Sequence, residues 1–185
     1  MEPGFTRRII KALIAALLIG LALAIGTGIV AYRYIHAYDA DIAGAAQEYG
    51  VDERLIRAVI WRESHFTRRR VGSRGEIGLM QVTENAAREW AAAAREPVPG
   101  KRELFKPSIN IRAGTWYLQR ALQFWSQKRD PLPYALCEYN AGRTPTLRWA
   151  AQDQNDPEIF LNAITYPTTR RYVRDILKRY RRSQR

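Results

Sequence analysis

A carboxylic acid stands where a helical pattern of the sequence calls for an apolar side chain. Leu55, Ile56, Val59 and Ile60 repeat at the spacing of a helix with one buried face, and Glu63 takes the next position of that series. Apolar neighbours and the negative end of the helix dipole both disfavour a carboxylate, so we expect a raised pKa. An acid still protonated near neutral pH can donate a proton to a leaving oxygen, as in glycosidic bond cleavage. The alternative is a glutamate that ends the helix and reaches into water.

The segment that follows this acid is polar, rich in arginine and punctuated by glycine. Ser64 comes directly after Glu63, and Gly72, Gly75 and Gly78 precede the next apolar residues. Glycines let the backbone approach a turn, another backbone segment or a ligand, because no Cβ intrudes. The pattern therefore predicts close backbone packing after the acid and leaves open which of these three is the partner.

Three short strings occur in order along the chain: Glu63-Ser64, Gly78-Leu79-Met80-Gln81 and Glu138-Tyr139-Asn140-Ala141-Gly142. Further matches lie at Asn110-Ile111, Gly114, Tyr117-Leu118, Thr169-Arg170 and Tyr172-Val173. Together they resemble the catalytic domain of the lytic transglycosylases of the soluble-transglycosylase type. The similarity extends over roughly residues 40–180. It implies a lysozyme-like fold and the cleavage of glycan strands of bacterial cell walls.

The resemblance implies that Glu63 is the only catalytic carboxylate. The acid would protonate the glycosidic oxygen between N-acetylmuramic acid and N-acetylglucosamine, and would then take a proton from the C6 hydroxyl of the same muramic acid. That hydroxyl attacks C1 and closes a 1,6-anhydro ring, so no water is consumed. The N-acetyl group of the substrate would stabilise the positive charge in between, which removes the need for a second carboxylate.

The resemblance also implies substrate-binding residues around the acid. They are Ser64, Gly78, Met80, Gln81, Tyr139, Asn140 and Tyr172, and Tyr166 is a further candidate. Several have a structural alternative. Ser64 could make a hydrogen bond at the end of its helix, and Met80 could belong to the core. Tyr166 and Tyr172 are expected either to stack on sugar rings or to lie in the core.

Three residues depart from the usual pattern of that family, namely Glu76, Glu138 and Thr168. Glu76 is the nearest acidic residue to the acid in sequence and could assist a water, although it could also be a solvated loop residue. Glu138 adds a carboxylate, but a helical position next to Tyr139 should face elsewhere. A hydrolytic muramidase and a non-catalytic wall-binding scaffold of the same fold therefore remain alternatives.

The chain is expected to have three parts. Residues 1–11 are short and basic, with Arg7, Arg8 and Lys11, and residues 12–32 contain no charged side chain. The apolar run is long enough to span a bilayer, and the flanking charges predict a cytoplasmic N-terminus. A cleaved signal peptide is the alternative. Residues 33–185 would then form a lysozyme-like catalytic domain on the extracytoplasmic side, where the wall lies.

The fold class expected for residues 33–185 is all-α, because no segment alternates with period two over a useful length. Capping residues and helix breakers predict helices over about 39–49, 52–63, 83–95, 108–128, 131–139, 146–151 and 168–182. The segment between Pro97 and Pro107 is expected to be an irregular connection, and a turn is expected near Pro157.

The composition predicts an anionic partner. Thirty Lys and Arg stand against eighteen Asp and Glu, a net charge of +12. Nucleic acid, acidic phospholipid and anionic wall polymers all fit this charge, but the expected anchor and the lack of a nucleic-acid motif argue against the first. The basic stretch from Arg170 to Arg185 is expected to form a helix that contacts lipid head groups or the wall.

No metal or other cofactor is expected. His36 and His65 have no second ligand at metal-binding spacing. Cys137 is the single cysteine of the sequence, so it cannot form an intramolecular disulfide, and its apolar neighbours predict a buried side chain.

Overall fold

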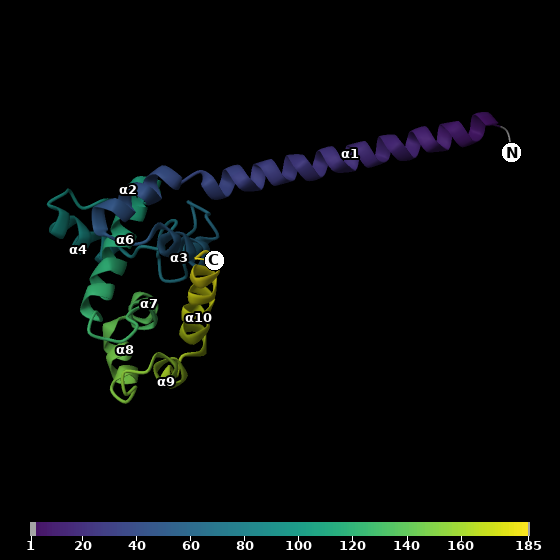
Figure 1. Cartoon of the computed structure of the whole chain (residues 1–185). Helices are drawn as coiled ribbons and strands as arrows, with labels where there is room; N and C mark the ends of the chain where they lie inside the picture. Colours follow the sequence, from purple (N-terminus) through teal and green to yellow (C-terminus); the bar gives the residue numbers. More distant parts are fainter. Residues whose placement is uncertain (1–2, 185) are drawn as a thin grey trace. The chain divides into compact units, whose positions relative to one another are not determined.

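The computed structural model of the protein describes residues 3–184, apart from the side chains of residues 3–9 and 35. Two compact units are present, Met1–Tyr38 and Asp39–Arg185. The first contains α1, Pro3–His36 (Figure 1). The helical stretch that begins at Ile10 is the one among the described residues that is long and apolar enough to cross a membrane. In the expected basic segment 1–11, residues 1–2 and the side chains of residues 3–9 lie outside the described part.

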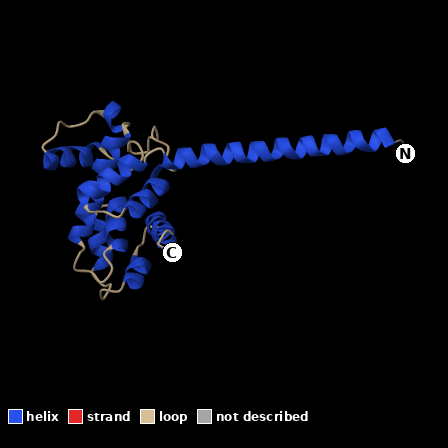
Figure 2. Cartoon of the chain, turned by 45° about the horizontal axis from the view of Figure 1, so that its top comes forward, coloured by secondary structure: helices blue, strands red, loops and turns tan. Residues whose placement is uncertain are grey.

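The second unit is built from helices joined by loops (Figure 2). They are α2 Asp39–Tyr49, α3 Glu53–Ser64, α4 Glu84–Ala94, α5 Lys101–Leu104, α6 Pro107–Phe124, α7 Leu132–Ala141, α8 Arg143–Ala150, α9 Pro157–Ala163 and α10 Pro167–Arg182. Residues 3–184 contain no strand, only isolated bridges from Ile77 to Val71 and Val82. The expected all-α class is confirmed.

Local capping explains where several of these helices begin and end. The Asp52 side chain accepts a hydrogen bond from the Arg54 amide at the start of α3, and Thr83 accepts one from the Ala86 amide at the start of α4. Each satisfies an amide at the first turn that has no partner within the helix. Gly142, with φ of 88°, follows the last residue of α7. The starts of α3 and α4 were expected from the sequence.

Two short helices were not expected. The connection before Pro107 contains α5, where Glu103 accepts a hydrogen bond from the Gly100 amide. At the expected turn near Pro157 the chain forms α9, because Asp156 accepts hydrogen bonds from the amides of Glu158 and Ile159. A cap and a proline at the first helical position are a helix-start signal, which the turn interpretation missed.

Helix α6 lies at the centre of the second unit. Helices α2, α4, α5 and α7 all pack against it, while α10 packs against α7 and α3. Ile111, Gly114 and Leu118 on α6 are buried. A Cβ on Gly114 would lie 2.6 Å from the Cβ of Met80, so this glycine lets α6 approach the 78–82 turn closely.

A buried asparagine fastens the loop between α3 and α4 to α6. Asn110 accepts a hydrogen bond from the Met80 amide at 2.8 Å, and its Nδ2 donates to the carbonyls of Ile77 and Leu104, each at 2.8 Å. Only 1% of Asn110 is exposed, so water cannot replace these bonds. One side chain therefore fixes the 77–80 segment against two helices.

The substitution Asn110→Ala is expected to lower the free energy of unfolding by about 2–4 kcal/mol, because it leaves the Met80 amide and the Leu104 carbonyl without this partner and removes one of two hydrogen bonds to the Ile77 carbonyl. Chemical denaturation followed by near-ultraviolet circular dichroism measures this. Asn85→Ala, which removes an exposed hydrogen bond to Arg88, is the matched control and should cost less than about 0.5 kcal/mol. Equal losses in the two variants would contradict the role of Asn110.

Candidate active site

Glu63 lies in the last turn of α3, where the chain turns sharply. The two residues after α3, His65 and Phe66, have φ values of 49° and 62°, in the left-handed region that non-glycine residues rarely adopt. Phe66 is buried and fixes this turn against the core. The helix therefore ends directly after Glu63-Ser64, and the backbone leaves space beside the acid.

The carboxyl group of Glu63 is held by a tyrosine from the last helix. The Tyr172 hydroxyl on α10 donates a hydrogen bond of 2.6 Å to Oε1 of Glu63. Burial raises the pKa of Glu63 to about 7, although this hydrogen bond and the charge of Arg62 act in the opposite direction. Burial also raises the pKa of Tyr172 well above its usual value, so its hydroxyl remains a donor. The raised pKa expected for Glu63 is confirmed, with desolvation as its main cause.

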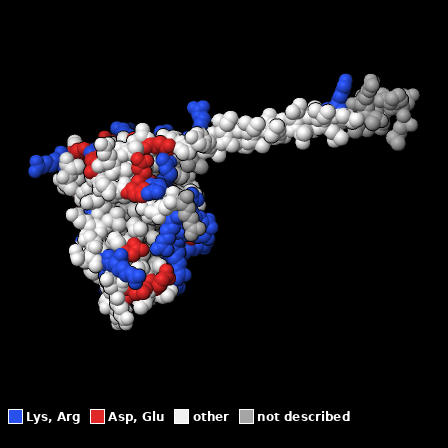
Figure 3. All heavy atoms as spheres, in the orientation of Figure 1, with Lys and Arg blue, Asp and Glu red and all other residues white. Residues whose placement is uncertain are grey.

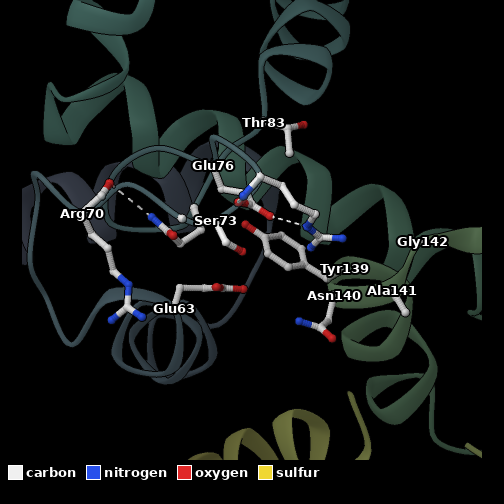
Figure 4. A pocket seen from close by; sticks show the side chains of 12 residues that line it. Glu63, Arg70, Ser73, Glu76, Thr83, Tyr139, Asn140, Ala141 and Gly142 are labelled. Atoms are coloured by element: carbon white, nitrogen blue, oxygen red, sulfur yellow. Dashed lines mark hydrogen bonds and ion pairs between the residues drawn. The ribbon is translucent and has the colours of Figure 1, made fainter. Parts of the chain in front are cut away.

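Glu63 opens onto a cleft of about 500 Å³, in which its carboxyl converges with Tyr139 and Asn140 (Figure 4). The cleft is lined by Glu63, Arg70, Gly72, Ser73, Arg74, Glu76, Gln81, Thr83, Tyr139, Asn140, Ala141 and Gly142. These residues come from the end of α3, the loop before α4, and the end of α7. The α7 wall is fixed by the Tyr139 hydroxyl, which donates to the Met80 carbonyl at 2.8 Å, and by Thr169, which donates to Oδ1 of Asn140 at 2.8 Å.

Hydrogen bonds within the loop of residues 67–82 form the opposite wall. The Arg70 carbonyl accepts from the Gly78 amide at 2.9 Å and from Nε2 of Gln81 at 3.3 Å. Gln81 also donates to the Gly78 carbonyl at 2.9 Å. Gly78 has φ of 82°, and a Cβ there would collide with the Asn110 side chain. The close approach expected at Gly78 is thus between its own backbone and a buried side chain.

The sequence-predicted site residues separate into two groups. Glu63, Gln81, Tyr139 and Asn140 line the cleft. The others do not, namely Ser64, Gly78, Met80, Tyr166 and Tyr172. The side chains of Ser64, Met80 and Tyr172 are buried, so they cannot contact a bound sugar.

Each of these differences has a physical reason. The Ser64 hydroxyl donates back to the Ile60 carbonyl at 3.1 Å, which is the structural alternative for this residue. Met80 packs against Gly114 in the core. Tyr172 reaches Glu63 from the buried face of α10, so it contacts the acid rather than a sugar. Tyr166 is 52% exposed at the start of α10 and packs edge-on against Trp149.

The two additional glutamates have different environments. Glu76 lines the cleft and accepts hydrogen bonds from the amide and Nε of Arg74 at 2.9 and 2.8 Å. Burial alone would raise the pKa of Glu76, but these hydrogen bonds lower it. Its negative charge in turn raises the pKa of Glu63. Glu138 is 2% exposed and bound by Trp125 and Arg143, so it faces away from the cleft, as its helical position predicted.

Some residues of the site were not selected from the sequence. Arg70, Ser73 and Thr83 line the cleft, and Thr169 positions Asn140. Arg70 lies between Glu63 and Gly72, and Ser73 directly follows Gly72, so their proximity to the acid in sequence was a usable signal. No sequence pattern connects Thr169 with Asn140, because α7 and α10 meet only in the folded chain.

The described part of the chain contains no group of three or more His, Cys, Asp and Glu side chains placed to hold a metal ion. Cys137 is buried on α7, and burial raises the pKa of its thiol to about 12. The cleft itself contains the carboxyl group of Glu63, which is partly protonated at neutral pH and can transfer a proton.

A protein-family model described as the transglycosylase SLT domain matches residues 41–161, more than half of the chain. The chain belongs to the transglycosylase SLT family. A similar curated relative is the membrane-bound lytic murein transglycosylase C of Yersinia enterocolitica, 32% identical over 133 residues, which are 69% of this chain and 37% of the relative. The chain thus spans well under half the length of this relative.

Solved structures agree with the SLT family assignment. An inactive mutant of the lytic transglycosylase Slt from Pseudomonas aeruginosa superposes with a TM-score of 0.72 at 26% identity, covering 80% of this chain and 24% of that protein. The 70-kDa soluble lytic transglycosylase in complex with bulgecin A gives a TM-score of 0.71 at 25% identity, covering 82% and 25%. The SLT domain of this chain therefore has the lysozyme-like fold.

In this SLT domain, Tyr172→Phe is expected to raise the pKa of Glu63 by about one unit, because the lost hydrogen bond stabilises the carboxylate. A carbon-13 NMR titration of the glutamate carboxyl groups measures the shift. Tyr139→Phe is the matched control, since that hydroxyl donates to a carbonyl, and it should leave the pKa of Glu63 near its present value. A pKa that falls in Tyr172→Phe would contradict this role.

The raised pKa of Glu63 also predicts a pH-dependent cost in stability. Between the usual value of 4.5 and about 7, the folded chain keeps a proton that the unfolded chain has lost, so stability decreases as pH rises through this interval. Glu63→Gln should therefore stabilise the protein by about 2 kcal/mol at pH near 8 and by little at pH near 4. The gain at pH near 8 is limited because solvent reaches the partly exposed carboxyl group.

Denaturant unfolding at the two pH values tests this expectation. Glu53→Gln, at an exposed position of the same helix, is the matched control and should lack the gain at the higher pH. A stabilisation of Glu63→Gln that is equal at both pH values would show that protonation is not its cause.

Proposed function

We propose that the chain is a peptidoglycan lytic transglycosylase that cleaves the β-1,4 bond between N-acetylmuramic acid and N-acetylglucosamine, with Glu63 as its single acid and base. The observation that supports this most directly is a partly buried carboxyl group in the cleft whose pKa is raised to about 7. Such a group is present in both protonation states near neutral pH, and the two steps need both.

In the first step Glu63 donates its proton to the glycosidic oxygen. Desolvation makes the neutral acid available, and the Tyr172 hydroxyl then stabilises the carboxylate that is left. The bond from C1 of the muramic acid to the protonated oxygen breaks, and the electron pair leaves with that oxygen. The positive charge that develops at C1 is stabilised by the N-acetyl oxygen of the same sugar.

In the second step the carboxylate of Glu63 acts as a base. It takes the proton of the C6 hydroxyl, whose oxygen forms a bond to C1 and closes the 1,6-anhydro ring. The acid is then protonated again, so the cycle closes without water. Because Tyr172 keeps its own proton, it orients Glu63 and does not take part in the transfer.

Substrate contacts are proposed for the polar side chains that line the cleft around the acid. Asn140 is oriented by its hydrogen bond from Thr169. Gln81 is oriented by its hydrogen bonds to the carbonyls of Arg70 and Gly78 in its own loop. Each therefore offers a fixed polar edge to a sugar, as expected for residues that position rather than react. Tyr166, exposed near the start of α10, is proposed as a stacking contact for a sugar beyond the cleft.

A hydrolytic muramidase is the second proposal, and Glu76 is the observation that favours it. This carboxylate lines the same cleft, and hydrogen bonds from Arg74 hold it in the ionised form that could orient a water. The hydrogen bonds from Arg74 to Glu76 are also the reason that we prefer the anhydro route. A carboxylate with both oxygens hydrogen-bonded to one arginine residue is poorly placed to take a proton from water.

We also propose that α1 anchors the protein in the cytoplasmic membrane as a single pass, with residues 1–11 inside and the SLT domain on the extracytoplasmic side. The apolar composition of α1 and the basic residues before it support this topology. The relatives named membrane-bound are consistent with it. The proposed substrate lies on that side of the membrane.

Mass spectrometry of the muropeptides that the full chain, in mild detergent, releases from purified sacculi tests the reaction. Products that end in 1,6-anhydro-muramic acid, lighter by one water than hydrolysis products, are expected. Glu63→Gln should lower their rate of release by about 100-fold or more. Glu76→Gln is the matched control and should keep the anhydro products.

The remaining outcomes separate the alternatives. Reducing-end products that disappear in Glu76→Gln would make the protein a muramidase. If the unmodified chain binds sacculi and releases nothing, the protein is a wall-binding scaffold, and the acid at position 63 has no catalytic role.

A further inference from the structure

Helix α10 presents two faces of opposite character. Its inner face carries Tyr172, Val173 and Ile176, which are buried against α3 and α7. Its outer face carries exposed basic side chains, namely Arg171, Arg174, Lys178, Arg179, Arg181 and Arg182. We call these six residues the basic face of α10. In the space-filling view, Lys and Arg gather over the end of this helix (Figure 3).

The basic face is incompletely neutralised by the protein itself. Asp175 lies 3.4 Å from Arg62 and 3.9 Å from Arg171, and Asp130 lies 3.5 Å from Arg181. Within residues 3–184, no ion pair involves Lys178, Arg179 or Arg182. Three cations on adjacent turns of one helix repel each other, so an external anion would relieve that repulsion.

An aromatic side chain lies within this surface. The Arg179 guanidinium stacks over the Trp61 ring, 3.7 Å from its centroid. Burial against the protein and the charge of Arg182 both lower the pKa of Arg179. Trp61, four of the cations and the acidic Asp175 line a hollow of about 640 Å³ that extends to Ser183. Tryptophan is enriched at membrane–water interfaces.

A second hollow, of about 490 Å³, lies along the other side of the same helix. Lys178 and Arg182 line both hollows, and the second also contains Arg181 and the apolar side chains of Leu161 and Leu177. Glu158 is its one acidic lining residue. The surface is therefore a cationic ridge with a concavity on either side, large enough for head groups and not only for small ions.

The connection to α1 favours a membrane over a wall polymer as the partner. Two residues, 37 and 38, separate the end of α1 from the start of α2. If α1 spans the bilayer, a domain of this size, with a radius of gyration of about 15 Å, stays within its own diameter of the lipid surface. That tether makes docking intramolecular, so weak contacts suffice.

We propose that the basic face of α10 docks onto acidic phospholipid head groups of the membrane in which α1 is anchored. The inference rests on the proposed anchor, and it is independent of the reaction at Glu63. Contact of one face of α10 with the membrane would fix the orientation of the domain. The opposite face of the same helix carries Tyr172, the partner of the acid. The cleft would then have one orientation relative to the membrane.

A nitroxide label on a Ser183→Cys variant of the full chain reports the docking. Ser183 is exposed in the Trp61 hollow, and the native Cys137 is buried, so the label attaches at one site. The labelled chain is placed in nanodiscs of neutral phosphatidylcholine or of phosphatidylcholine with phosphatidylglycerol. We expect protection of the label from a water-soluble relaxation agent only in the anionic nanodiscs, and loss of that protection at high salt.

Two triple variants test the residues. Lys178→Gln, Arg179→Gln and Arg182→Gln together should lower the ratio of docked to free label by about tenfold or more. The matched control, Arg88→Gln, Arg95→Gln and Arg102→Gln, removes the same charge from exposed positions around α4 and α5 and should keep the docking. Both variants should release muropeptides from sacculi in detergent at the normal rate, because neither changes the cleft.

Other outcomes overturn the inference in distinguishable ways. Equal exposure of the label in neutral and anionic nanodiscs, or equal docking by the two triple variants, would rule out lipid docking by α10. Protection in neutral nanodiscs that appears only when sacculi are added would make the wall the partner. A chain that does not migrate with the nanodiscs would refute the anchor and this inference together, while the sacculus assay would still report the reaction.

Discussion

The hydrogen bond between Tyr172 and Glu63 joins the parts of the SLT domain that the site depends on. It connects α10 to the end of α3 across a partly buried carboxyl group, at 2.6 Å. Burial alone would push the pKa of that acid higher, and the tyrosine lowers it towards neutrality. The balance leaves an acid that can both give and accept a proton. The raised pKa of Glu63 also lowers the free energy of unfolding at pH values above the usual pKa of a glutamate. Such a cost is commonly found at functional sites.

Buried polar side chains that hydrogen-bond to the backbone hold the walls of the cleft in place. Asn110 fixes one wall from beneath by bonding three backbone groups, and Tyr139 connects the other wall to it through the Met80 carbonyl. These contacts are buried or partly buried, so their loss would leave unpaired groups in a region that water does not reach. The walls are therefore set before any ligand arrives, which is the condition for positioning a reactive bond.

Helix α10 has a part in both proposals because its two faces have different tasks. The inner face supplies Tyr172 to the acid, and the basic face carries charge that the domain does not neutralise. A rigid helix transmits orientation from one face to the other, so contact with a surface would also orient the cleft. A flexible basic tail could bind the same partner but would leave the domain free to rotate.

The sequence by itself determined what depends on local order. Spacing identified Glu63 as a misplaced carboxylate, capping residues located the starts of α3 and α4, and the motifs around Gly78 and Tyr139 indicated the family. Only the tertiary structure decided which side chains face the cleft. It placed Ser64 and Met80 in the core and turned Tyr172 towards the acid. It also paired Thr169 with Asn140. The reason is physical: helical periodicity shows that a residue has a buried face, but its partner is set by how separate helices pack.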